Sequence, residues 1–306
     1  MSDKIKERYR RKKISENTKK SQTTALLWLS DYRKKIPFKD LNKKFIEGFE
    51  SWMQKQNNKR TKEKKKLDGN TIANVMKYVK AYINLAIDDH IPIENPFVKA
   101  DVKTVQDVKM IEHLRPRDVA KLIKYYRQEI PIGEKLTLCR FLIACHLSLR
   151  ISDILKPNES KLEYYKAVGK LIFHPQKQEL TKKLKTVYVH IDEYAMKYME
   201  DCVELQIEAI KRGLKISEPY GRKALKTISN KLGMEIAGFH MGRHTFATNY
   251  IRFGGKVTNL QYIMGHSNIN TTMRYVHIVE EDTDEDMISL SRGYLAFMNT
   301  KKEPVK

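Results

Sequence analysis

The sequence contains few cysteines, and their positions argue against two common kinds of stabilised site. Only three occur among 306 residues, namely Cys139, Cys145 and Cys202, and no two form a CxxC pair. An odd number of widely spaced cysteines favours neither a disulfide framework nor a zinc site. We therefore expect three reduced thiols that pack in the hydrophobic core.

Long apolar segments are also missing. No segment approaches the roughly 18 consecutive apolar residues of a membrane span. The chain begins with the polar residues Met1-Ser2-Asp3-Lys4 rather than with the pattern of a signal peptide. These absences predict a cytoplasmic protein without a membrane partner.

Acidic residues are scarce relative to basic ones. The chain has 37 Asp and Glu against 59 Lys and Arg, which gives a formal net charge of +22 at pH 7. Residues 1–106 contain 26 of the basic and 13 of the acidic side chains, so the N-terminal third has the denser positive charge. This excess indicates a polyanionic partner, with nucleic acid the leading candidate, although charge alone also suits a protein that is merely soluble.

Length and periodicity predict two domains. A chain of 306 residues with 41% hydrophobic content is long enough for two packed cores. Residues 1–14 are polar and basic and predict a flexible arm, whereas 15–97 contain three segments with apolar residues at helical spacing. The polar segment 98–112 suits a linker. Residues 113–278 then form the second domain, and 279–306 form an acidic segment followed by one amphipathic helix.

The second domain is predicted to be mainly helical with one small sheet. A strongly apolar helix runs from Glu134 to about Leu149. Two β-rich segments, 171–174 and 186–190, flank a Lys-rich stretch and predict an antiparallel hairpin. Helices are expected over 192–212 and 220–233. The fold class is therefore mainly α with a small antiparallel β-sheet.

The most informative motif lies between His240 and His277. In a helix, His240 and Arg243 lie on one face about 5–6 Å apart. His266 follows Gly265 at a turn, and Tyr275 follows nine residues later. A tyrosine is a poor nucleophile because its phenol has a pKa near 10. Nearby cations and hydrogen-bond donors would assist it, and they would also stabilise the charge that develops on an attacked phosphate.

These blocks resemble the signature of the tyrosine recombinases, also called the phage integrase family. The resemblance covers about residues 15–298. It implies a two-domain clamp around DNA, with a helical, SAM-like core-binding domain over 15–97 and a mixed α/β catalytic domain over 113–278. It also implies that Tyr275 attacks a DNA phosphate to give a 3′-phosphotyrosine and a free 5′-hydroxyl. Because the bond energy is conserved, the reaction uses no ATP, metal or other cofactor.

The same resemblance assigns further residues of the active site. The segment Leu147-Ser148-Leu149-Arg150 is similar to the family's Gly-Leu-Arg block, so Arg150 would pair with Arg243 on the phosphate. Asp153 would orient a neighbouring catalytic side chain. The resemblance also implies that His240 and His266 bind the phosphate and that His240 manages the proton of Tyr275. A lysine of the hairpin would act as general acid. Lys177 fits this role best, and Lys182, Lys183 and Lys185 remain alternatives.

Two positions depart from the family pattern. Ser148 replaces the usual Gly, and Gly242 stands where relatives usually have Leu. A glycine inside a helix costs about 1 kcal/mol relative to Ala, and the sequence offers no compensating reason for Gly242.

The expected partner is double-stranded DNA. The resemblance implies a monomer when free, a homotetramer on synapsed DNA, accessory DNA-bending proteins and association with the nucleoid. We also expect the helix of about 285–298 to dock on a neighbouring protomer, with packing on its own chain as the alternative. Two other functions remain open: a type IB topoisomerase-like strand transferase, and a DNA-binding relative that has lost catalysis.

Overall fold

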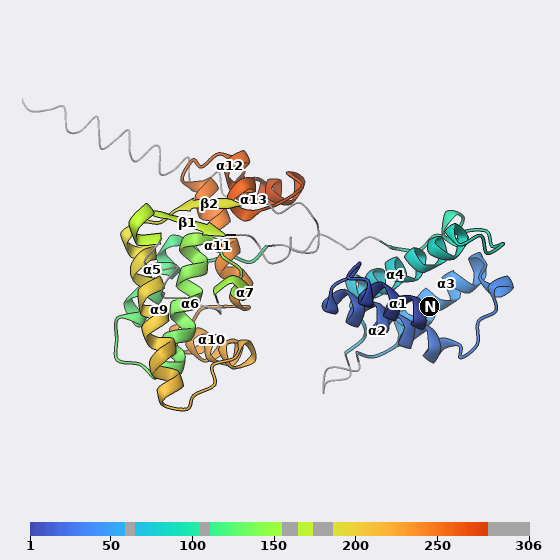
Figure 1. Ribbon diagram of the computed structural model, residues 1–306, viewed down its shortest axis with the longest axis horizontal. Helices are drawn as coiled ribbons and strands as arrows, with labels where there is room; N and C mark the ends of the chain where they lie inside the picture. The colour runs from blue at the N-terminus through green and yellow to red at the C-terminus, as the bar shows by residue number, and fades with distance from the viewer. Residues whose placement is uncertain (59–64, 105–110, 155–164, 174–185, 281–306) are drawn as a thin grey trace, which may run out of the picture. The chain divides into compact units, whose positions relative to one another are not determined.

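The computed structural model describes residues 1–58, 65–104, 111–154, 165–173 and 186–280. The chain divides into two compact units, Met1–Lys109 and Met110–Lys306 (Figure 1). The described elements are mainly helices, and β1 and β2 form a two-stranded antiparallel sheet. The predicted fold class is confirmed, and the division falls inside the predicted linker of 98–112.

The described residues of the first unit include four α-helices. They are α1 (Ser2–Arg10), α2 (Glu16–Tyr32), α3 (Lys43–Lys55) and α4 (Gly69–Asp88), with the short 3-10 helices η1 (Phe38–Asp40) and η2 (Pro96–Val98). Side-chain caps fix two of the starts, because Ser15 accepts from the Thr18 amide and Asn42 accepts from the Phe45 amide. The apolar faces of α2, α3 and α4 meet in one core that includes buried Trp28, Phe49 and Met76.

The N-terminal segment is helical, so the prediction of a flexible arm over 1–14 was wrong. Ile5 and Ile14 are both buried, and they pack with Tyr82 of α4 in a small separate cluster. Lys4 also pairs with Asp89 at 2.7 Å. Two apolar side chains cannot stabilise an isolated segment, but a preformed apolar face of α4 covers them.

The second unit surrounds the apolar helix α6. Its elements are α5 (Pro116–Tyr126), α6 (Ile132–Leu147), α7 (Ile151–Ile154), β1 (Lys170–Phe173), β2 (Val187–His190), α9 (Glu193–Lys211), α10 (Glu218–Leu232), α11 (Phe239–Arg252), α12 (Val257–Met264) and α13 (Asn270–Glu280). Helix α6 packs against α5, α9, α10 and α11, so most of its side chains are buried. Cys139 and Cys202 are buried as predicted, and Cys145 is half-buried.

Both strands of the predicted hairpin are present. β1 and β2 pair antiparallel, with Leu171 opposite Val189 and Phe173 opposite Val187. Leu171, Val187 and Val189 are buried in the main core of the unit. The segment between the strands, which includes Lys177 and the alternative lysines, lies outside the described residues, as does the C-terminal segment 281–306.

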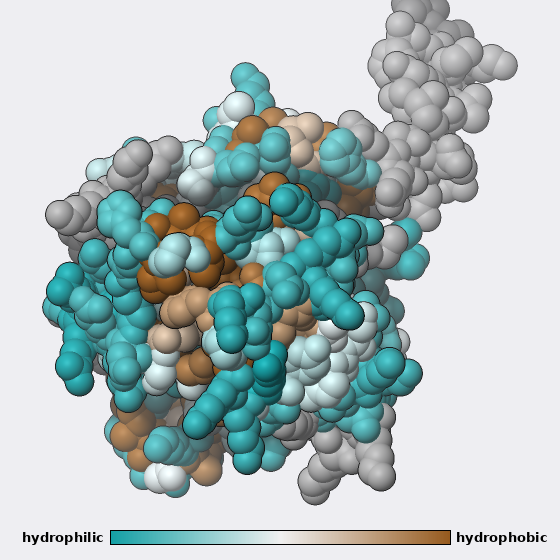
Figure 2. Space-filling model, turned by 90° about the vertical axis from the view of Figure 1, so that its right-hand side faces the viewer, coloured by the Kyte–Doolittle hydropathy of each residue, from teal (hydrophilic) through white to brown (hydrophobic). Residues whose placement is uncertain are grey.

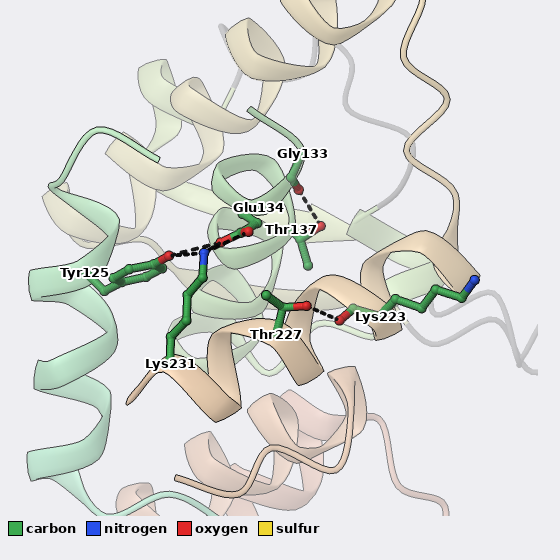
Figure 3. A network of polar contacts seen from close by, with 7 residues as sticks. All are labelled: Tyr125, Gly133, Glu134, Thr137, Lys223, Thr227 and Lys231. Atoms are coloured by element: carbon green, nitrogen blue, oxygen red, sulfur yellow. Dashed lines mark hydrogen bonds and ion pairs between the residues drawn. The ribbon is translucent and has the colours of Figure 1, made fainter. Parts of the chain in front are cut away.

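A polar network fixes α10 on α5 and α6. The Lys231 ammonium lies 3.0 Å from both carboxylate oxygens of Glu134 and donates to the Tyr125 hydroxyl at 3.1 Å (Figure 3). The Tyr125 hydroxyl in turn donates to Glu134 at 3.0 Å. Because three helices share one network, the scaffold around α6 is held in register.

Gly242 has a packing role that the sequence did not reveal. A Cβ at this position of α11 would lie 3.0 Å from the Ala144 Cβ and 3.1 Å from the Phe141 carbonyl oxygen of α6. A backbone oxygen cannot move aside as a flexible side chain can, so glycine allows α11 to approach α6 closely. This approach brings Arg243 to the end of α6.

Figure 2 shows a face that is mostly hydrophilic, with smaller apolar areas between the hydrophilic side chains. Within the described ranges, every helix is too short or too polar to cross a membrane.

Candidate active site

Arg243 lies at the centre of the predicted site and is 2% exposed. One terminal nitrogen of its guanidinium donates to the Ser148 carbonyl, and the other donates to the Met264 carbonyl. Burial, followed by the nearby charge of Arg150, lowers the pKa of Arg243 to about 10, so the group remains a cation at pH 7. Arg243 therefore joins the end of α6 to the end of α12 while it places a positive charge between them.

Arg150 reaches the same site through an unusual helix end. Ser148 caps α6 in the left-handed conformation, with φ of 56°, and this turns the chain before α7 begins at Ile151. The charge of Arg150 lowers the pKa of Arg243 and of His266, while Asp153 acts on Arg243 in the opposite direction. Both predicted residues thus lie within electrostatic range of the centre.

His266 follows the left-handed Gly265 at the end of α12, where φ is 61°. Its Nε2 lies 3.4 Å from the guanidinium of Arg243, and its Nδ1 lies 2.9 Å from the Thr272 hydroxyl. Burial, with the charges of Arg243 and Arg150, lowers the pKa of His266 to about 4. At pH 7 the ring is therefore neutral.

Tyr275 on α13 is 3% exposed, and its hydroxyl lies 2.8 Å from Nδ1 of His244. Burial raises the pKa of Tyr275 above its ordinary value, although Arg243, Arg274 and Arg150 act in the opposite direction. Burial also lowers the pKa of His244 to about 3. Because both groups are neutral at pH 7, the phenol donates when His244 carries its proton on Nε2, and it accepts when that proton is on Nδ1.

The family resemblance implies that His240 manages the proton of Tyr275, whereas the side chain in contact with the Tyr275 hydroxyl is His244. His240 is exposed, and its ring centre lies 4.5 Å from that of His244, with the planes at 81°. No sequence spacing could identify His244, because it is separated from Tyr275 by 31 positions. The contact arises from the packing of α11 against α13.

The loop before α5 covers this end of α11. The Leu114 amide donates to the Thr245 hydroxyl at 2.9 Å, and Asn249 donates to the Leu114 carbonyl at 3.5 Å.

The described residues contain no group of three or more His, Cys, Asp or Glu side chains that could hold a metal ion.

Ser148→Gly is expected to stabilise the protein by about 1 kcal/mol. The substitution relieves a left-handed conformation that costs other residues roughly 1–2 kcal/mol. It also removes a buried hydroxyl without a hydrogen-bond partner, and the gain exceeds the entropy cost of glycine. Thermal unfolding followed by circular dichroism should show Tm higher by about 2–4 °C. Ser148→Ala is the matched control, since it removes the hydroxyl but keeps the strain, and a glycine variant no more stable than the alanine variant would contradict the prediction.

Two family comparisons account for most of the chain. Residues 112–282 match the phage integrase family, and residues 1–103 match the phage integrase SAM-like domain. This chain belongs to the phage integrase family. The tyrosine recombinases of this family are enzymes that cleave and rejoin DNA. The SAM-like match includes α1, which agrees with the packing of that helix in the first unit.

Individual relatives are distant. Tyrosine recombinase XerC of Bacillus licheniformis is 22% identical over 237 residues, which cover 71% of this chain and 73% of that protein. The putative integrase of Pseudomonas phage Pf1 is 42% identical over 75 residues, 24% of this chain and 22% of that protein. Among solved structures, the Tn1549 transposon integrase in complex with transposon right-end DNA has a TM-score of 0.66 at 18% identity, covering 92% of this chain and 97% of that one. The last similarity supports the fold.

Proposed function

We propose that this tyrosine recombinase cleaves and rejoins double-stranded DNA at specific sites through a 3′-phosphotyrosine formed by Tyr275. The observation that carries the proposal is the position of the Tyr275 hydroxyl, which lies 2.8 Å from Nδ1 of His244 and within the electrostatic field of Arg150 and Arg243. A phosphodiester placed against these cations would present its phosphorus to the phenol oxygen. The exchange of partners between two cleaved duplexes would then integrate, excise or invert DNA.

The roles of the cations follow from the chemistry of phosphoryl transfer. Negative charge grows on the non-bridging oxygens as the Tyr275 oxygen approaches, and preorganised donors stabilise it. Arg150 and Arg243 would bind these oxygens with planar guanidinium groups. His240 and His266 would complete the ring of donors. Asp153 would hold Arg243 and its neighbours in place through its charge.

The leaving 5′-oxygen requires a proton, and we propose that Lys177 supplies it. Lys177→Ala should slow cleavage of ordinary DNA by about 10²–10⁴-fold, the usual contribution of a general acid. A 5′-bridging phosphorothiolate should restore the rate, because sulfur leaves without protonation. Adduct formation on both substrates, measured with rapid sampling, tests this expectation.

Lys182→Ala is the matched control for Lys177→Ala, since it removes the same charge from the same segment. Rescue by sulfur in the Lys182 variant instead would assign the general acid to that lysine. Absence of rescue in both variants would move the role to Lys183 or Lys185.

We further propose that the protein is a monomer when free, and that four copies assemble on two synapsed duplexes in the nucleoid, with DNA-bending proteins as accessory partners. The basic surface expected from the net charge of +22 would bind the phosphates. Assembly distinguishes a recombinase from a type IB topoisomerase-like enzyme, which would religate a single duplex. The C-terminal docking predicted for 285–298 belongs to this proposal and lies outside the described residues.

The test of the function begins with the selection of a DNA sequence that the protein binds. Duplexes that the protein retains would be selected from a random-sequence pool and then nicked near the expected cleavage point to trap the adduct. Labelled strands from one duplex should become joined to strands of a second. Relaxation or religation within one duplex alone would support the topoisomerase-like alternative, and binding without any adduct would support a catalytically silent relative.

A further inference from the structure

Cleavage by Tyr275 requires a group that takes the phenol proton. The proton must leave as the oxygen–phosphorus bond forms, because a protonated phosphotyrosine ester is not a stable product. A general base has to lie within hydrogen-bond reach of the proton it removes, at about 2.6–3.2 Å between heavy atoms. Nδ1 of His244 lies 2.8 Å from the Tyr275 hydroxyl oxygen.

We propose that His244 accepts the proton of Tyr275 during cleavage and returns it when the phosphotyrosine is resolved. The inference rests on the proposed function, since it assigns a role within that reaction. His244 contacts the reacting oxygen itself, so it is a catalytic residue in this scheme. His240 remains a candidate for binding the phosphate from the exposed side.

The proposed role requires one tautomer of His244. Tyr275 and His244 are both neutral at pH 7, and in the required tautomer the phenol keeps its proton while Nδ1 supplies the lone pair. The second proton of the neutral imidazole is then on Nε2. In this tautomer the lone pair points at the proton that must move, and the 2.8 Å contact needs no rearrangement of the ring.

The surroundings of His244 explain why it is a weak base in the free protein. Its basicity is lowered first by burial and then by positive or titratable groups on three segments. These are His240 and Arg243 on α11, Arg274 on α13 and His113 in the loop before α5. A bound phosphodiester brings negative charge against the arginines and so removes part of this penalty. DNA binding would therefore strengthen the base at the point where it is needed.

The proposed step is balanced in atoms and charge. The Tyr275 oxygen forms a bond to phosphorus as its proton passes to Nδ1 of His244, which becomes an imidazolium. The bond between phosphorus and the 5′-oxygen breaks, and that oxygen receives a proton from the general acid. In the rejoining step the 5′-hydroxyl returns its proton to the deprotonated general acid as its oxygen attacks phosphorus, and Tyr275 leaves as the phenol with the proton that His244 returns.

The experiment compares His244→Ala and His244→Asn on the nicked duplex described above. Alanine removes the acceptor, whereas the Asn side-chain oxygen can accept the same hydrogen bond but cannot become a stable proton carrier near neutral pH. Both variants should form the adduct about 10²–10⁴-fold more slowly than wild type at pH 7. Between pH 6 and 9 the wild-type rate should be nearly flat, while the variants should accelerate with a slope near one in the logarithm of the rate. The slope arises because, without the base, the Tyr275 phenol must lose its proton to the solvent before it attacks, and the ionised fraction rises about tenfold per pH unit.

Three results would overturn the proposal. One is a wild-type rate in His244→Ala, and another is recovery in His244→Asn, which would leave only a hydrogen-bonding role. The third is a flat pH profile in the slow variants. His146→Asn serves as the matched control, because it removes another half-buried imidazole of the same unit, whose ring lies 5.4 Å from that of Tyr198.

Parallel measurements separate this inference from the proposed function. Tm and affinity for the uncleaved duplex verify that each variant is folded and binds DNA. If wild type forms no adduct, or Tyr275→Phe forms one, the proposed function itself fails. If wild type forms the adduct and Tyr275→Phe does not, while the His244 variants match wild type, only the role of His244 is wrong.

Discussion

Tyr275→Phe should abolish the covalent protein–DNA adduct and leave DNA affinity close to that of wild type. The substitution removes only the hydroxyl oxygen of a side chain that is 3% exposed, so the basic surface and the buried ring are retained. Its expected cost is about 1 kcal/mol, from the hydrogen bond lost at Nδ1 of His244. Denaturing gels with labelled, nicked DNA measure the adduct, and a binding titration at fixed salt measures the affinity.

Tyr262→Phe is the matched control for this experiment. The Tyr262 hydroxyl accepts from the Tyr188 amide at 3.1 Å and donates to the Thr186 carbonyl at 3.3 Å, so it connects α12 to β2. This variant should be less stable than wild type but should still form the adduct. If Tyr275→Phe still formed the labelled protein–DNA adduct and Tyr262→Phe did not, Tyr262 would be the nucleophile.

Arg243→Met should lower both stability and cleavage. The side chain donates to two buried backbone carbonyls, those of Ser148 and Met264. Each carbonyl left without a partner costs about 1–3 kcal/mol, so the free energy of unfolding should fall by roughly 2–6 kcal/mol. Tm should fall by roughly 5–15 °C. Adduct formation should fall by at least about 10²-fold, as when one preorganised donor is removed from a developing oxyanion.

The sign of the stability change separates two roles for Arg243. If the guanidinium served only a DNA phosphate, its removal would eliminate a buried charge, and such replacements are often neutral or stabilising. A loss of stability in DNA-free protein therefore indicates that Arg243 also holds α6 and α12 together. Arg243→Lys is the control, because it keeps the charge but a single ammonium cannot reproduce the planar fork. A Met variant as stable as wild type would contradict the bracing role.

The fold class and most of the elements were predictable because they depend on local patterns. Helical spacing identified the helices now seen as α2, α3 and α4, and β-rich segments identified the two strands. The apolar run from Glu134 to Leu149 identified the central helix α6. Motif order predicted a site around His240, Arg243 and His266, and the structure places the first two on one helix and the third at the turn that ends another.

The N-terminal helix was not predictable in the same way. Residues 1–14 contain few apolar side chains, and their pattern favours an unstructured segment. Ile5 and Ile14 are buried by Tyr82, which is far along the chain. The packing of α1 depends on a surface that exists only after α4 has folded.

The sequence by itself indicated the family and the order of the candidate site residues, because each is encoded in residue type and short spacing. Only the tertiary structure decided which histidine contacts Tyr275, how Arg243 uses its donors and why residue 242 is glycine. Each of these depends on two helices meeting, α11 with α13, α12 or α6. Periodicity specifies which face of a helix is apolar, but the approach and rotation of packed helices come from the complementary shapes of both partners.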